Sequence, residues 1–213
     1  MNLNEDKLNR QPLIERLFSI FDNFGNQSDK GLTMLINGQY GSGKSTLLAF
    51  IEEENNKKNK FNIIKYDAWE NNFFENPIIP ILYTISQLEN LTEKLKNEIS
   101  NMIKNVPKAI FNTLANASNI DIKTFTANEN IFKEYDLYKA SIIRFKKRLT
   151  KLCAERKIIF LVDELDRCLP EYQIKVLESL YHLLDIPNLI VVIAMDKKQL
   201  EYSIKCKFGD AIN

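Results

Sequence analysis

Glycine is concentrated in one short stretch of the sequence, INGQYGSGKST, which spans residues 36–46. Three of the six glycines of the chain, Gly38, Gly41 and Gly43, lie within it. Glycine lets the backbone curl closely around a ligand, because a Cβ atom would collide with the ligand or forbid a positive φ. The stretch fits the pattern G-x-x-x-x-G-K-[ST], follows an apolar run and opens a helical pattern. This context predicts a loop that binds phosphate groups.

The polar groups of this loop have the chemistry that a nucleotide site needs. We expect its inward-pointing N–H groups, together with the start of the following helix, to bind phosphate oxygens. Lys44 would reach the terminal phosphates, the Ser45 hydroxyl would ligate Mg²⁺, and Thr46 would lie near the α-phosphate. An ordinary glycine-rich turn is the alternative. The expected nucleotide-binding residues are Gly38, Gly41, Ser42, Gly43, Lys44, Ser45 and Thr46.

Two carboxylates, Asp163 and Glu164, directly follow the apolar run IIFLV. A carboxylate at the end of a buried strand costs free energy unless a cation or a ligand meets it. In a parallel sheet, the carboxyl ends of the strands are also where ligands bind. We therefore predict that Asp163 holds Mg²⁺, through water, and that Glu164 polarises a water molecule in line with the γ-phosphate. A surface loop with incidental acidic residues is the alternative.

The second of these carboxylates distinguishes between reaction types. A small-molecule phosphotransferase passes phosphate to a bound substrate and needs no base directed at water, so Glu164 favours hydrolysis. A GTPase would be expected to carry an N-K-x-D segment late in the chain, and MDKKQL at residues 195–200 does not fit it. ATP is therefore favoured over GTP. A scaffold that binds ATP without useful turnover is the second hypothesis.

Strand and helix patterns alternate along the chain and would position these groups. Apolar runs predict strands at residues 31–38, 61–69, 157–166 and 188–196. Helical spacing predicts helices at residues 12–24, 44–55, 134–156, 171–185 and 197–208. This alternation predicts a three-layer α/β/α fold with a mostly parallel sheet. Within a single domain spanning 1–213, we expect residues 77–130 to form a helical insertion between the second and third strands, with a break at Pro107.

The composition limits the classes of function. The 213 residues are 45% hydrophobic, which is enough for one α/β domain with an insertion. The formal net charge of +1 gives no general attraction to nucleic acid or to anionic membranes. The apolar runs are far shorter than a membrane span, and no pair of cysteines has C-x-x-C spacing. We expect a cytoplasmic protein with reduced thiols and no transmembrane segment.

Several segments together resemble the KAP family of P-loop NTPases, in the additional-strand (ASCE) division that also contains AAA+ and STAND proteins. INGQYGSGKSTLL is similar to the family's glycine loop, and IKYDAWENN is similar to its aromatic motif at a strand end. NLIVVIAMDKKQLEYSI resembles the fourth strand and its helix, and DKLNRQPLIERL the lead-in that packs near the base. FLVDELDRCLPEYQIKVLESL, which contains the acidic pair, is the most specific segment. The resemblance leaves out residues 77–130.

The resemblance implies an ATPase switch of the kind found in bacteria on plasmids, prophages and defence islands, including phage-exclusion proteins. It assigns phosphate and metal binding to the glycine loop, and metal and water to the acidic pair. Asp196, at the end of the fourth strand, matches the position of a sensor for the γ-phosphate or the attacking water. Asp166 and Arg167 match the family motif. For Arg167, a transition-state contact and a salt bridge to Asp166 or Glu164 both remain open.

The sequence ends at FGDAIN, directly after the helix that follows the fourth strand. Relatives continue into a fifth strand and a helical lid, so we expect both to be missing. An uncovered sheet edge favours pairing with a protein partner or with a second copy of the chain. We therefore expect nucleotide binding to be better supported than robust hydrolysis.

Two smaller features have a simple and a specific interpretation. Arg144, Lys147, Arg148 and Lys151 form a basic face on the long helix. A solvated helix face is the simpler interpretation, and contact with nucleic-acid phosphates or anionic lipids is the alternative. Trp69 is expected to be a packing anchor rather than a stacking platform.

Overall fold

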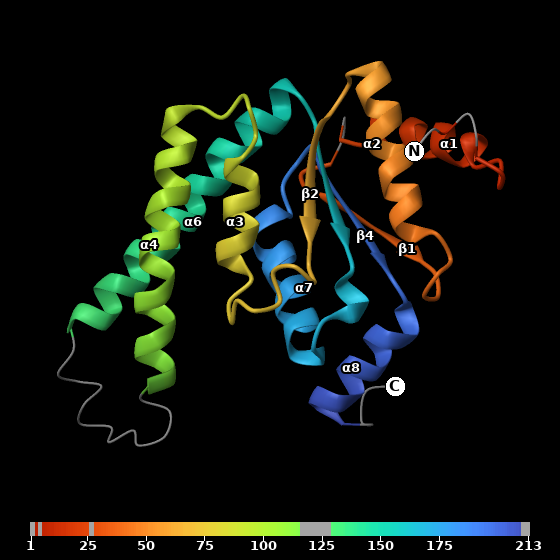
Figure 1. Cartoon of the computed structure of the whole chain (residues 1–213). Coiled ribbons are helices and arrows are strands. Elements are labelled where there is room, and N and C mark those ends of the chain that lie inside the picture. The colour runs from red at the N-terminus through yellow and green to blue at the C-terminus, as the bar shows by residue number, and fades with distance from the viewer. Residues whose placement is uncertain (1–2, 4–5, 26–27, 116–128, 210–213) are drawn as a thin grey trace.

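The computed structural model describes residues 3, 6–25, 28–115 and 129–209. Within these residues one sheet of parallel strands runs through the molecule, in the order β1-β4-β3-β2 (Figure 1). The strands are β1 (Leu32–Asn37), β2 (Asn62–Asp67), β3 (Ile158–Asp163) and β4 (Leu189–Met195). The predicted α/β fold with a parallel sheet is confirmed.

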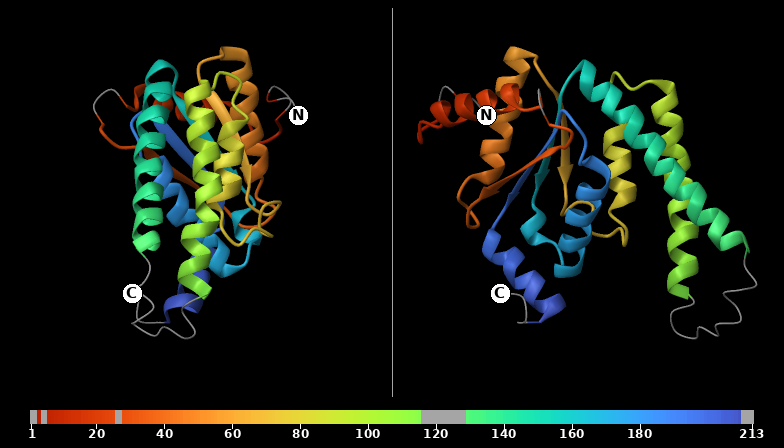
Figure 2. Two further views of the ribbon diagram at one scale, coloured as in Figure 1. Left: turned by 90° about the vertical axis from the view of Figure 1, so that its left-hand side faces the viewer. Right: turned by 180° about the vertical axis from the view of Figure 1, so that it is seen from behind.

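Helices cover both faces of this sheet and give the predicted three layers (Figure 2). One face carries α1 (Gln11–Asn23) and α2 (Lys44–Lys58), whose core includes the contacting rings of Phe18, Phe21 and Phe61. The helices of the other face are α3 (Ile78–Ser86), α4 (Glu93–Ala115), α6 (Glu129–Glu155) and α7 (Pro170–Leu184). The last helix, α8 (Lys197–Phe208), packs against α7 beyond the carboxyl end of β4.

The central strands and the first strand differ in burial. All residues of β4 and all but Asp163 of β3 are buried, as expected for apolar runs covered on both faces. β1 instead alternates, with its even-numbered residues half-buried against α1 and α2 and Leu35 44% exposed. The predicted strand is thus confirmed, but its apolar run would have suggested burial on both faces and one face is exposed. Within the described residues, β1 lies at the edge of the sheet and no helix covers its second face.

The described residues between β2 and β3 are mostly helical, as predicted, but their helices differ from those expected. α4 continues through Pro107, so the predicted break there is wrong. A proline removes one backbone donor, and the packing of α4 along α6 keeps the helix continuous. The long helix begins at Glu129 rather than at residue 134. Among the described residues, no helix is both long and apolar enough to cross a membrane.

One lysine ties α1 to the sheet. Lys157, directly before β3, donates hydrogen bonds from Nζ to the carbonyl oxygens of Phe21 (3.2 Å), Asp22 (2.6 Å) and Phe24. These oxygens lie at the carboxyl end of α1, where the carbonyls lack helical partners and attract a cation. Burial lowers the pKa of Lys157, and the neighbouring Asp22 partly opposes this shift.

We expect Lys157→Met to lower the free energy of unfolding by about 2 kcal/mol, because it leaves several carbonyl oxygens without their donor. Urea denaturation followed by circular dichroism measures this change. The matched control is Lys30→Met at an exposed lysine, which should change stability by less than about 0.5 kcal/mol. Equal stability of both variants would contradict a role of Lys157 in docking α1.

Candidate functional site

The glycine loop connects β1 to α2, in the context that the sequence predicts. Gly43 adopts φ 85° directly before the first residue of α2, a conformation that favours glycine. Gly38 is constrained by space, since a Cβ atom there would lie 2.4 Å from the Ser42 hydroxyl. Position 43 therefore favours glycine by its conformation, whereas a larger residue at Gly38 would force the Ser42 hydroxyl to move. Gly41, Ser42 and Ser45 are exposed, and Thr46 is half-buried in the first turn of α2.

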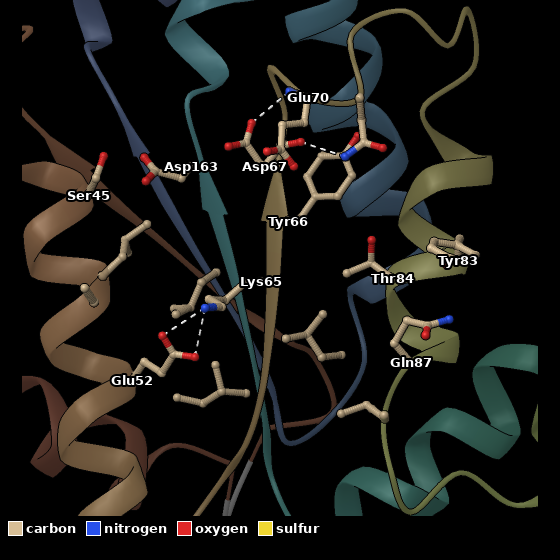
Figure 3. Close-up of a pocket in the computed structure, with 17 residues that line it drawn as sticks. Ser45, Glu52, Lys65, Tyr66, Asp67, Glu70, Tyr83, Thr84, Gln87 and Asp163 are labelled. Carbon is tan, nitrogen blue, oxygen red and sulfur yellow. Dashed lines mark hydrogen bonds and ion pairs between the residues drawn. The ribbon is translucent and has the colours of Figure 1, made fainter.

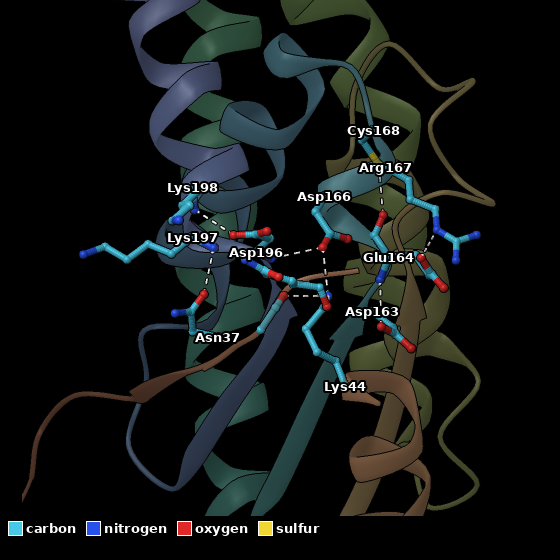
Figure 4. Close-up of polar contacts among 12 residues, drawn as sticks. Asn37, Lys44, Asp163, Glu164, Asp166, Arg167, Cys168, Asp196, Lys197 and Lys198 are labelled. Carbon is cyan, nitrogen blue, oxygen red and sulfur yellow. Dashed lines mark hydrogen bonds and ion pairs between the residues drawn. The ribbon is translucent and has the colours of Figure 1, made fainter. Parts of the chain in front are cut away.

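Lys44 lies folded into the loop that precedes it (Figure 4). Its Nζ donates to the carbonyl oxygens of Gly38 (2.9 Å) and Gln39 (3.3 Å). The same ammonium forms an ion pair with Asp166 at 3.1 Å, and both side chains are only 10% exposed. The loop and Asp166 thus hold this lysine where a phosphate oxygen could replace the carboxylate.

Ser45 of α2 and Asp163 of β3 lie across from each other at one end of a groove that continues along β2 (Figure 3). The Asp163 carboxylate accepts the N–H of Glu164 at 2.9 Å. In the described part of the chain, no lysine or arginine forms an ion pair with Asp163. A hydroxyl and a carboxylate are oxygen ligands of the kind that Mg²⁺ prefers. This pair of donors therefore fits a magnesium ion.

Glu164 combines several unusual features. Its φ of 57° places a non-glycine residue in the left-handed region, where strain is often found at functional sites. Burial raises its pKa, the Arg167 guanidinium lowers it, and the nearby carboxylates raise it further. Arg167 forms an ion pair with Glu164 and lies over the ring of Tyr40, 5.2 Å from its centroid. In this structure Arg167 therefore forms the salt bridge to Glu164, one of the two roles that the sequence left open.

Asp166 and Asp196 connect the turn that follows β3 to the end of β4 (Figure 4). Asp166 accepts the backbone N–H of Asp196 at 3.0 Å, in addition to its ion pair with Lys44. The Asp196 carboxylate accepts the N–H of Lys198 at 2.9 Å and so caps the amino terminus of α8. Asp196 therefore lies one hydrogen bond away from the carboxylate that holds Lys44. Its predicted role as a sensor stays a prediction.

Asn37 is a polar residue of this region that our reading of the sequence missed. It is the last residue of β1, and its side-chain oxygen accepts the N–H of Lys197 at 2.9 Å. This bond ties the strand before the glycine loop to the start of α8. Its signal in the sequence was its position directly before Gly38, at the strand end where ligands bind.

We expect Asp166→Asn to raise the affinity for ATP about fivefold, because the carboxylate competes with phosphate for Lys44. Asparagine retains an oxygen that can accept the Asp196 N–H. Titration calorimetry with a non-hydrolysable ATP analogue measures the effect, with Asp29→Asn at an exposed position as the control. A lower affinity of Asp166→Asn would instead show that this carboxylate assists nucleotide binding.

Two of the smaller sequence features have definite positions. Trp69 lies in the turn after β2 and is 51% exposed. About half of its surface packs against the protein, so the prediction of a packing anchor holds only in part. On α6, Arg144 and Arg148 form ion pairs with Glu98 of α4 at 3.1 and 3.5 Å. Glu98 is buried. The basic face is thus partly neutralised by α4, which weakens the case for contact with nucleic acid.

The strand order, the glycine loop after β1 and the acidic end of β3 define a P-loop nucleoside-triphosphatase domain. The family model described as the KAP family P-loop domain matches residues 10–212, so this chain belongs to that family. The match includes residues 77–130, which the resemblance of the short segments left out. A comparison with curated proteins finds no match. Membership of this family makes the chain a nucleotide-binding domain of the NTPase type and confirms the family predicted from the sequence.

Proposed function

We propose that the chain is a Mg²⁺-dependent ATPase that acts as a conformational switch. The proposal rests on one observation: four polar residues come together at the carboxyl ends of the parallel strands. They are Lys44, Ser45, Asp163 and Glu164. β1 and β3 are separated by β4, and the two loops still meet because all strands end at the same edge. Such a site combines a phosphate-binding loop, a metal-binding pair and a candidate base for water.

Each residue has a role in the proposed reaction. Ser45 and Asp163 would hold Mg²⁺, which would supply positive charge next to the phosphates. Lys44 would leave Asp166 for the phosphates. Glu164 would leave Arg167 and orient a water molecule for attack on the γ-phosphate.

These two exchanges explain why the domain would behave as a switch. In the conformation described, Lys44 and Glu164 are both engaged by protein groups, Asp166 and Arg167, within the same 3₁₀ turn (Leu165–Arg167). Nucleotide binding would release both partners at once. Asp166 would pass this change to α8 through its hydrogen bond to Asp196. Anti-phage defence in bacteria is the biological setting that the family resemblance favours.

A nucleotide-stabilised scaffold with little turnover is the second candidate. The ion pair between Arg167 and Glu164 favours it, because a base held by a cation is less able to accept a proton. In this case ATP would bind to the glycine loop and order the surrounding turns without being hydrolysed.

Phosphate release by the purified chain with ATP and Mg²⁺ tests the proposal, with ATP plus EDTA and GTP plus Mg²⁺ as comparisons. We expect release only with the metal, and faster release with ATP than with GTP. ATP binding is measured in parallel by calorimetry. Binding without release in any condition would favour the scaffold, and the absence of binding would contradict both candidates.

A further inference from the structure

A groove runs along the outer edge of β2, with α2 on one side and α3 on the other (Figure 3). Its volume is about 730 Å³, and it extends from Ser45 and Asp163 to Gln87 and Leu88. β2 pairs with β3 on its inner side, and within the described residues no strand pairs with its outer side. The groove therefore contains an unpaired edge of the sheet.

Backbone hydrogen-bonding groups of β2 point into this groove. The N–H groups of Asn62 and Ala68 donate to the carbonyl oxygens of Lys157, directly before β3, and of Asp163 in β3, at 2.9 and 3.0 Å. The backbone N–H and C=O groups of the even-numbered residues therefore point toward β3. Alternate residues of a parallel strand direct their N–H and C=O groups to opposite sides. Ile63, Lys65 and Asp67 therefore direct theirs into the groove.

These outward groups are largely available to a partner. The Asp67 carbonyl already accepts a hydrogen bond from the Asn71 side chain at 2.8 Å. For the N–H and C=O groups of Ile63 and Lys65, no partner is found in the part of the chain that the structure describes. Such a row of donors and acceptors is what an added strand pairs with.

The walls of the groove suit an extended chain. The half-buried Ala49 contributes an apolar surface from α2, while Thr84 and Gln87 contribute polar groups from α3. Lys65 carries a charge of the kind that protects an edge strand from pairing. Here the Glu52 carboxylate neutralises it at 2.9 Å. The charge therefore does not exclude a basic occupant.

The end of the groove nearest the carboxyl end of β2 is acidic. The Asp67 carboxylate accepts the N–H of Glu70 at 2.9 Å. Neither Asp67 nor Glu70 forms an ion pair with a lysine or arginine among the residues that the structure places. With Asp163 committed to the metal, these two carboxylates remain for a basic side chain of the occupant.

We propose that this groove binds an extended, basic segment of a partner protein, which pairs with the outer edge of β2 as an additional strand. The backbone of the segment bonds to Ile63 and Lys65, an apolar side chain packs against Ala49, and a lysine or arginine meets Asp67 and Glu70. A second copy of the chain fits less well, since its edge strand β1, LTMLIN, has no basic residue and Lys65 of its other edge strand, β2, is already paired with Glu52. This binding does not depend on whether the chain hydrolyses ATP.

The probe is a fluorescein-labelled peptide of alternating threonine and valine with one arginine near its end, measured by fluorescence anisotropy without nucleotide. We expect the full chain to bind this peptide. N-methylation of alternate peptide nitrogens should weaken binding at least about tenfold, because it removes the backbone donors that face β2. Equal binding of the methylated peptide, or no binding of the parent peptide at millimolar concentration, would overturn the proposal.

Two variants test the edge and the charge separately. Lys65→Pro removes a donor from the outer edge but not from the ladder with β3, and we expect about a tenfold loss of binding, whereas Lys65→Met should bind normally. Glu70→Lys should reverse the preference between the arginine peptide and one with glutamate in its place. The exposed Glu178→Lys should not. Since Lys65→Pro could fail to fold, its unfolding midpoint is measured, and Glu70→Lys tests the proposal independently. Unchanged preference in Glu70→Lys, or self-association that Lys65→Pro abolishes, would overturn the assignment to a basic partner.

Discussion

Glu164→Gln is expected to lower the rate of ATP hydrolysis at least about 100-fold while ATP binding changes by less than about threefold. Glutamine has nearly the same shape as glutamate and can adopt the same backbone conformation. It cannot accept a proton from water. The substitution removes the ion pair with Arg167 and leaves the glycine loop and Lys44 unchanged. ATP can therefore still reach the phosphate site, and a loss of turnover would report the loss of the base.

Phosphate release and calorimetric ATP binding are measured on the same preparation. The control is Glu178→Gln at an exposed position of α7, which should leave both quantities unchanged. Because burial raises the pKa of Glu164, the ionised base is lost at a higher pH than for an ordinary glutamate. The wild-type rate should therefore fall as the pH decreases through that raised pKa. A Glu164→Gln protein with normal turnover would remove Glu164 from the mechanism.

Lys44→Ala is expected to weaken ATP binding at least about 100-fold, and hydrolysis with it. The substitution removes the ammonium that would meet the terminal phosphates. It also leaves Asp166, which is only 10% exposed and 3.1 Å from Lys44 Nζ, without its cation. An unpaired carboxylate at this position would repel the phosphates. Both effects lower the affinity.

The control for this change is Lys57→Ala, since Lys57 lies on the same helix and pairs with Glu53 at the surface. The double variant Lys44→Ala with Asp166→Asn separates the two effects. It should recover part of the lost affinity, because the repulsive charge is gone while the missing cation is not restored. If Lys44→Ala alone bound ATP as tightly as the wild type, the glycine loop would not be the phosphate site.

The sequence predicts the loop and the fold well because their signals are local. Gly38 is favoured by the close approach of the Ser42 side chain and Gly43 by its positive φ, and both conditions act within a few residues. The buried strands β3 and β4 are read from continuous apolar runs, since strands covered on both faces need no polar side. The apolar residues of the first strand, in contrast, do not reveal that it lies at a sheet edge with one face exposed.

Contacts between distant segments follow from the tertiary structure alone. Asp166 pairs with Lys44 across more than 120 positions of the chain, and Lys197 bonds to Asn37 across 160. These contacts depend on the strand order, which places β4 between β1 and β3. No local pattern encodes that order, because the free energy that selects it comes from burying both faces of the whole sheet. The sequence by itself determined which groups could bind phosphate and metal, whereas the packing of the sheet decided that Lys44 and Glu164 are held by Asp166 and Arg167, and that the edge of β2 stays open.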